Sequence, residues 1–172
     1  MSEQQRVRDS VRYFLTVWLV ERDLEKAKAS FGAAAFRNEA ILQASCAGYI
    51  RPEDRGSENA RRAGVQKFLQ KFLPQKPVTA LSEVLDGNAI APLVDQLGTR
   101  VANDPKLDLF VLARLRAEEL PVGEARDVDY LRKSVPSSSY VSFIPVGQGM
   151  IYFVWIPQGS EWRIYHASLV CM

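Results

Sequence analysis

The chain has 172 residues, of which 47% are hydrophobic and 24% are charged, and its formal net charge is +2. This composition predicts one ordinary globular domain over residues 1–172, long enough to bury a core. A charge so near neutrality gives no indication of a nucleic-acid partner, and no apolar run approaches the ~20 residues of a membrane span, so we expect neither. The start lacks the apolar core of a signal peptide; we expect a cytoplasmic protein if this start is native, and an exported one if Met1 replaces a cleaved leader.

The first part of the chain is predicted to be helical. Apolar residues over 7–20 recur at helical spacing and form one broad face. Asp23 is placed to cap a second helix over 24–31, which Gly32 closes.

The middle of the chain carries more helices than strands. The alanine-rich segment 33–47 predicts a third helix, with a strand over 40–45 as the alternative. A basic helix follows from Ser57 or Asn59 to about Leu73. We interpret its basic side chains as a solvated face, with an anionic partner surface as the alternative. The remaining predictions are a loop over 48–56, a helical turn over 79–86, helices over 88–102 and 125–133, and a strand over 109–115 for which a helix over 107–120 is the alternative.

Residues 140–170 predict three strands joined by two short turns. The run 150–156 carries no polar group except the hydroxyl of Tyr152, so both of its faces are expected to be covered. A turn follows with Gly159 in the left-handed conformation, and Gly147-Gln148-Gly149 forms the preceding turn. Helices that precede a sheet in the chain are typical of the α+β class. We therefore predict N-terminal helices packed on a curved antiparallel sheet with a C-terminal three-stranded meander.

The last run is expected to alternate along its whole length. One face would carry Trp162, Ile164, His166, Ser168 and Val170, and the other would carry Arg163, Tyr165, Ala167, Leu169 and Cys171. Neither face is cleanly polar. We therefore expect one to contact helices and the other to line a cavity or a partner surface.

The two ends of the chain resemble the nuclear transport factor 2-like superfamily of cystatin-like α+β cones. The opening from Trp18 to Phe31 resembles its first helix, acidic residue and short second helix, and Trp162 to Ser168 resembles its last strand. The resemblance implies a curved sheet wrapped by helices into a cone with an apolar pocket, and a homodimer through the open sheet face. The helix predicted over 33–47 departs from the family, which has its first β-hairpin there.

The resemblance also implies a catalytic hypothesis. The superfamily includes isomerases, dehydratases and cyclases that use a carboxylate or a His–Asp pair inside the cone. His166, the single histidine, would act as the base and Asp23 would orient it, while Tyr140, Tyr152 or Tyr165 donates to a developing oxyanion. The alternative, which we prefer, is that His166 is a strand residue bonded to a neighbouring carbonyl and Asp23 is a helix cap.

An aromatic set near the carboxyl end is the candidate for ligand binding, with ordinary core packing as the alternative. Its members are Tyr140, Phe143, Tyr152, Phe153, Trp155, Trp162 and Tyr165, of which Tyr140, Tyr152, Trp162 and Tyr165 are the predicted ligand-binding residues. The predicted function is a non-catalytic domain that binds a small apolar ligand or a protein partner. A lyase or isomerase acting on a small hydrophobic substrate through His166 is the alternative.

No cofactor or metal is predicted, because there is one histidine and no metal-ligand spacing. Cys46 and Cys171 are either two thiols or one long-range disulfide, and we prefer thiols.

Overall fold

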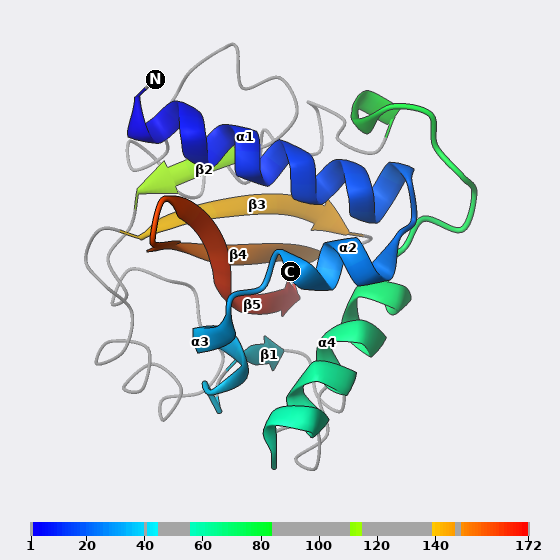
Figure 1. The fold of residues 1–172 in the computed structure, drawn as a ribbon. Coiled ribbons are helices and arrows are strands. Elements are labelled where there is room, and N and C mark those ends of the chain that lie inside the picture. The colour runs from blue at the N-terminus through cyan, green and yellow to red at the C-terminus, as the bar shows by residue number, and fades with distance from the viewer. Residues whose placement is uncertain are drawn as a thin grey trace.

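A computed structural model describes residues 2–39, 41–44, 56–83, 111–114, 139–146 and 149–171 of the chain. Its helices are α1 (Glu3–Leu15), the π-helix η1 (Thr16–Val20), α2 (Leu24–Ala29), α3 (Ala33–Phe36), α4 (Glu58–Lys71) and the 3-10 turn η3 (Leu81–Glu83). Its strands are β1 (Leu42–Ala44), β2 (Val111–Arg114), β3 (Tyr140–Val146), β4 (Gly149–Gln158) and β5 (Glu161–Cys171). The helices come first and the long strands last (Figure 1), which confirms the predicted α+β class.

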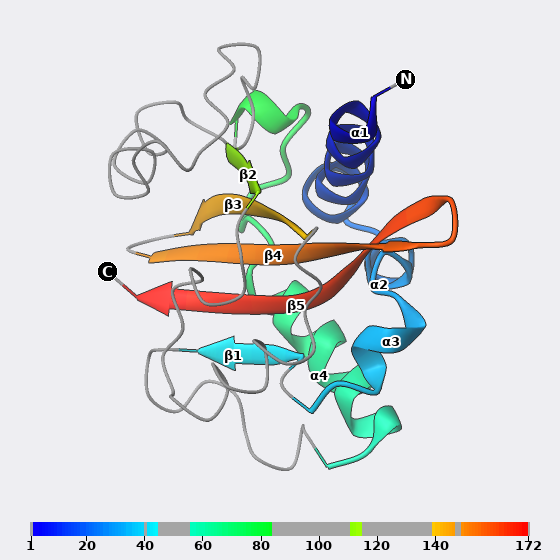
Figure 2. The same cartoon turned by 90° about the vertical axis from the view of Figure 1, so that its left-hand side faces the viewer.

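The described strands form one sheet in the order β1-β5-β4-β3-β2. Strands β3, β4 and β5 are antiparallel neighbours, as predicted, and β2 extends the sheet antiparallel to β3. Strand β1 closes the other side, parallel to β5. Figure 2 looks onto this sheet and shows the strands stacked across the molecule.

None of the described helices combines the length and the apolar character needed to cross a membrane.

The central strand β4 is covered on both sides, as its unbroken apolar run predicts. Residues 151–155 are each at most 1% exposed. Burying a large apolar side chain stabilises a fold by about 1.5–3 kcal/mol, so this strand is a main anchor of the core. At its end Gly159 has a φ of +63°, the predicted left-handed conformation, which glycine adopts without steric cost. The predicted turn residues Gly147 and Gln148 lie outside the described residues.

Helix α1 forms as its sequence predicts. The hydroxyl of Ser2 accepts a hydrogen bond from the backbone N–H of Gln5 at 3.1 Å, which caps the first turn. Val7, Val11 and Phe14 are fully buried at successive helical intervals. The spacing of apolar residues alone therefore identified both the helix and the side that it buries.

The chain leaves α1 through a wider turn. In η1 the backbone N–H of Glu21 donates to the carbonyl of Thr16 at 2.9 Å, a π-helical hydrogen bond. Arg22 follows with a φ of +57°, and its Nη1 donates to the carbonyl of Pro74 at 2.5 Å. This contact ties the turn to the segment that follows α4.

The helix predicted over 33–47 is wrong for the described residues after Phe36, and the alternative strand over 40–45 is confirmed as β1. Leu42 pairs with Ala167 of β5, and the N–H of Ala167 donates to the carbonyl of Ile41 at 2.8 Å. Helix propensities differ by at most about 0.7 kcal/mol for ordinary residues, so this pairing outweighs the alanine-rich local preference.

The other predictions for the middle of the chain are confirmed where the structure describes it. Helix α4 begins after Ser57, whose Oγ accepts from the N–H of Ala60 at 3.1 Å. The turn η3 lies inside the predicted segment 79–86. Strand β2 lies inside the predicted strand 109–115, so strand rather than helix is right there. The predicted helices over 88–102 and 125–133 and most of the loop over 48–56 lie outside the described residues, as does Cys46.

A β-bulge in β5 changes the faces expected for that strand. The successive pairs Val154–His166 and Trp155–Ile164 leave Tyr165 as an extra residue. An extra residue in one strand shifts its side chains by one position relative to the partner strand. The predicted strict alternation along β5 is therefore wrong.

The register of β3, β4 and β5 defines two faces, because directly paired residues point to the same side of a sheet. The face that α1 covers, called here the helix face, carries Tyr140, Ser142, Ile144, Ile151, Phe153, Trp155, Trp162, Ile164, Ala167 and Leu169. The opposite face, called here the far face, carries Val141, Phe143, Tyr152, Val154, His166 and Ser168. His166 is thus separated from Ile164, with which strict alternation would have grouped it.

Candidate functional site

His166 lies on the far face and is fully buried. Its ring centroid is 5.7 Å from that of Tyr152, which is also fully buried. Ser168, 1% exposed, is paired with Tyr152 across the two strands. Two of the predicted site residues, His166 and Tyr152, are therefore neighbours on the side of the sheet turned away from α1.

Asp23 is the N-cap of α2, as predicted. Its Oδ1 accepts a hydrogen bond from the backbone N–H of Lys26 at 3.0 Å. Its own N–H donates to the carbonyl of Val17 at 2.8 Å. The carboxylate is thus used at the start of α2, and the structure does not bring it into hydrogen-bonding contact with His166.

The other predicted ligand residues lie elsewhere. Tyr140 and Trp162 contact each other edge to face on the helix face, with ring centroids 5.4 Å apart. The hydroxyl of Tyr140 donates to Oε2 of Glu3 at 3.3 Å. Tyr165 is the bulge residue, and its carbonyl accepts from Nδ2 of Asn38 at 3.4 Å. The aromatic set predicted from the sequence therefore does not form one wall.

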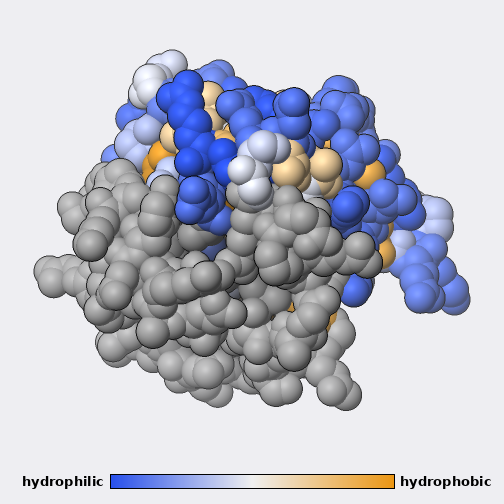
Figure 3. All heavy atoms as spheres, turned by 90° about the horizontal axis from the view of Figure 1, so that it is seen from below, coloured by the Kyte–Doolittle hydropathy of each residue, from blue (hydrophilic) through white to orange (hydrophobic). Residues whose placement is uncertain are grey.

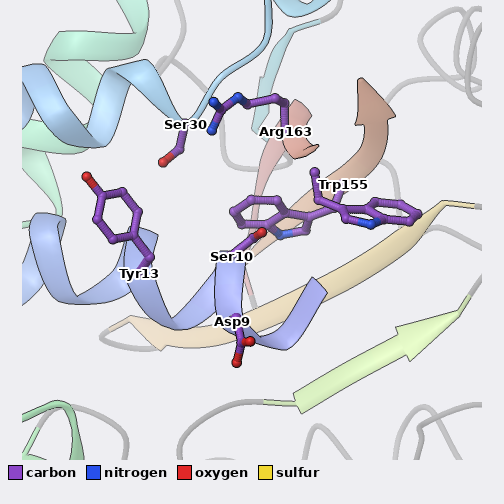
Figure 4. A pocket seen from close by; sticks show the side chains of 7 residues that line it. Asp9, Ser10, Tyr13, Ser30, Trp155 and Arg163 are labelled. Atoms are coloured by element: carbon purple, nitrogen blue, oxygen red, sulfur yellow. The ribbon is translucent and has the colours of Figure 1, made fainter. Parts of the chain in front are cut away.

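A surface pocket of about 230 Å³ opens beside α1. Three segments that are distant in the sequence meet there: α1, the end of α2 and the β4–β5 hairpin (Figure 4). Its lining residues are Asp9, Ser10, Tyr13, Ser30, Trp155, Trp162 and Arg163. Of the predicted ligand residues, Trp162 reaches this pocket, and so does Trp155 from the wider aromatic set.

Aromatic rings supply the apolar part of the lining. Tyr13 is 54% exposed and is the exposed large hydrophobic residue in the described part of the chain. Trp155 and Trp162 are 1% and 5% exposed, so they belong to the core and show only small surfaces to the pocket. The indole N–H of Trp155 donates to the hydroxyl of Ser142 at 2.9 Å, which fixes the ring. The pocket therefore has one exposed aromatic wall, Tyr13, and a buried aromatic base formed by Trp155 and Trp162.

Polar groups surround these rings. The guanidinium of Arg163 forms an ion pair with the carboxylate of Glu161. Oδ1 of Asp9 accepts from Nε2 of Gln5 at 2.9 Å. Figure 4 shows Arg163 and Ser30 on the same side of the pocket, whereas the carboxylate of Asp9 points away from them. One cation and one hydroxyl thus share one end of the pocket.

Gly32 lets these two residues approach each other. The sequence predicts that Gly32 closes α2, but its N–H donates to the carbonyl of Ile164 at 3.0 Å, and the N–H of Ile164 donates to the carbonyl of Ser30 at 2.8 Å. A Cβ on Gly32 would meet Oε1 of Gln158 and lie 3.1 Å from Cβ of Arg163. The side chain of Gln158 can move aside, so the tight contact is the one with Cβ of Arg163, where the backbone passes directly against β5.

Sequence reasoning missed most of this pocket. Tyr13 carried the available signal, because it is an aromatic residue on the polar side of an amphipathic helix. Ser30 and Arg163 carried none, since their proximity depends on the pairing of the segment after α2 with β5.

The lining suits binding better than acid–base chemistry. Among the described residues, the lining contains one carboxylate and neither histidine nor cysteine. Across the described residues, no three His, Cys, Asp or Glu side chains gather in a way that could hold a metal ion. Comparisons with protein-family models, curated proteins and solved structures found no match to this chain, so its function has to be argued from this geometry.

Proposed function

We propose that this protein is a non-catalytic domain that binds a small ligand with an apolar body in the pocket beside α1. The observation that carries the proposal is that the half-exposed ring of Tyr13 lines the same pocket as two core indoles, Trp155 and Trp162. Covering exposed apolar surface stabilises a complex by roughly 25 cal/mol per Å², and aromatic rings add specific contact geometry. A ligand with an apolar body gains both at this place.

A homodimer and membership of the nuclear transport factor 2-like superfamily remain part of the proposal. Strand β1 supports the family, because it lies before α4, where the family has its first hairpin. In Figure 3 hydrophilic residues cover most of the described surface on the side seen from below. Light scattering on the purified protein measures the mass of the particle, and a monomer at micromolar concentration would remove the dimer.

A second proposal is a lyase or isomerase that acts on a small hydrophobic substrate with His166 as general base. The observation that favours it is the buried neighbour Tyr152, whose hydroxyl is the kind of donor that stabilises an oxyanion. In this version Tyr152 replaces Asp23 as the partner of the imidazole. The proposal requires a substrate to reach the far face.

One NMR titration distinguishes the two proposals. The chain has three tryptophans and one histidine, so each indole N–H and the imidazole give signals that are simple to assign. Trp18 is a built-in control, because its indole N–H donates to the carbonyl of Leu69 at 2.8 Å inside the core. We expect benzamide, a neutral single-ring probe, to shift the signals of Trp155 and Trp162 and to leave Trp18 unchanged.

Two variants act as controls for the same titration. Tyr13→Ser removes the aromatic wall and should weaken the binding of benzamide, whereas Tyr13→Phe keeps the ring and should bind normally. Shifts confined to the imidazole of His166 would favour the enzyme proposal, and the absence of any shift at Trp155 and Trp162 would reject the binding proposal.

A further inference from the structure

We propose that the pocket beside α1 selects a small aromatic carboxylate, whose ring contacts Tyr13 and whose carboxylate binds Arg163 and Ser30. This inference rests on the proposed binding function and names the chemical class of its ligand. It depends on three features of the pocket: its size, its one lining cation and the available hydroxyl of Ser30.

The size of the pocket limits the ligand to about one ring. A volume of about 230 Å³ lies below the ~300–1,000 Å³ that is usual for drug-sized ligands. Aromatic rings contact one another in offset or edge-to-face arrangements at centroid distances of about 4.5–7 Å, which a single flat ring beside Tyr13 can adopt. A planar ring with one short polar substituent fits this space.

Arg163 determines the expected charge of that substituent. It is the one cationic residue among the described lining residues, and its present partner is Glu161, a residue two positions away whose side chain is 62% exposed. Ion pairs between exposed side chains are weak, so a ligand can compete with Glu161 for the guanidinium. A carboxylate is the group that a guanidinium binds through two parallel hydrogen bonds.

Ser30 supplies a second donor at the same end. Its N–H donates to the carbonyl of Ala27 at 3.1 Å and its carbonyl accepts from Ile164 at 2.8 Å, so its backbone is held on both sides. Within the described part of the chain, the hydroxyl itself has no hydrogen-bond partner, and it lines the pocket. The hydroxyl is therefore available to a carboxylate oxygen.

A cationic ligand is the less suitable occupant. The carboxylate that could attract it belongs to Asp9, which already accepts a hydrogen bond from Gln5 and points away from Arg163 and Ser30 in Figure 4. A cation placed against the aromatic rings would instead meet the like charge of Arg163. The charges around the pocket thus favour an anion.

The test is a set of NMR titrations with benzoate, benzamide and benzylammonium, three single-ring probes that differ in charge. We expect benzoate to bind more tightly than benzamide, and benzamide more tightly than benzylammonium, as followed by the indole signal of Trp162. Arg163→Gln should weaken benzoate binding by at least about tenfold, because a hydrogen-bonded charge pair is lost, and should change benzamide binding by less than about twofold. Arg163→Lys should fall between the two, since an ammonium group cannot bind a carboxylate in the same two-pronged way.

A second variant moves the affinity in the opposite direction. Glu161→Gln removes the carboxylate that competes for Arg163, and we expect it to tighten benzoate binding by about two- to fivefold, the range that an exposed ion pair is worth. The side chain of Glu161 is mostly exposed, so the fold should be kept, and an unchanged Trp18 signal verifies this.

The outcomes separate this inference from the function on which it rests. Equal binding of benzoate and benzamide, or benzoate binding that Arg163→Gln leaves unchanged, would overturn the selection of a carboxylate while the pocket remains a binding site. If none of the three probes shifts Trp162 in the unaltered protein, both the inference and the proposed function are overturned.

Discussion

The two faces of the sheet are equally well buried but are built from different chemistry. On the helix face, the ring of Phe153 lies 5.0 Å from that of Phe14 and 5.8 Å from that of Trp18, measured between centroids. On the far face, His166 and Ser168 are buried among apolar neighbours. Close packing of apolar groups stabilises the helix face. The far face buries polar groups, and a buried polar group that lacks a hydrogen bond lowers the stability of the fold.

This difference shows that an apolar strand predicts burial on both of its sides but does not predict where the polar side chains of its neighbour point. The unbroken run in β4 required cover on both sides, and both sides are covered. The polar groups of the far face come largely from β5, and the register of that strand decided where they point. The following predictions test this comparison in order of the expected effect.

The largest effect is expected on the helix face. Phe153→Ala removes a fully buried ring that contacts Phe14 and Trp18, and we expect the free energy of unfolding to fall by about 3–5 kcal/mol. Urea denaturation measures the loss. Val154→Ala, at the adjacent far-face position, is the matched control and should cost less because fewer atoms are removed. A loss below about 1 kcal/mol for Phe153→Ala would contradict the packing described for this face.

On the far face, the expected loss comes from a buried polar side chain rather than from a large apolar ring. His166→Leu removes the fully buried imidazole and leaves the buried hydroxyl-bearing ring of Tyr152 without its polar neighbour, so we expect a loss of about 1–3 kcal/mol in unfolding free energy. Ligand shifts at Trp162 should be unchanged in this variant, because the pocket lies beside α1. A variant as stable as the parent would show that the far face does not depend on its imidazole.

The next prediction concerns Asp23, the N-cap of α2. Asp23→Ala should lower the unfolding free energy by about 1 kcal/mol, as the loss of an N-cap does, whereas Asp23→Asn should retain most of the stability because asparagine caps equally well. Ser57→Ala, at the cap of α4, gives the matched reference. If Asp23→Asn lost as much as Asp23→Ala, the charge of the carboxylate would matter and capping would not explain the residue.

The smallest effect on stability is expected on the outer side of α1. Tyr13→Ser should change the unfolding free energy by less than about 0.5 kcal/mol, because the ring is half exposed. The same change should weaken ligand binding in the titrations described above. A marked loss of stability would instead mean that Tyr13 is part of the core. The ring of Tyr13 would then no longer support the proposal that the pocket binds a ligand.

Local pattern was sufficient for several elements of the fold. The helical spacing of Val7, Val11 and Phe14 predicts α1 and its buried side, and the apolar run 150–156 predicts a strand covered twice. Glycine at position 159 predicts the left-handed turn residue. These features depend on residues close together in the chain, and so a single sequence contains the information that determines them.

The candidate site depends on contacts that no local pattern records. Strand β1 forms because Leu42 meets Ala167, and that pairing outweighs the helical preference of its alanine-rich surroundings. One extra residue, Tyr165, sends His166 to the far face, since a shift of one position reverses every later side chain of a strand. The sequence by itself determined where α1, α2, α4 and the long strands lie. The tertiary structure decided which strand edge, which face and which pocket each polar residue reached, because those depend on pairing between distant segments.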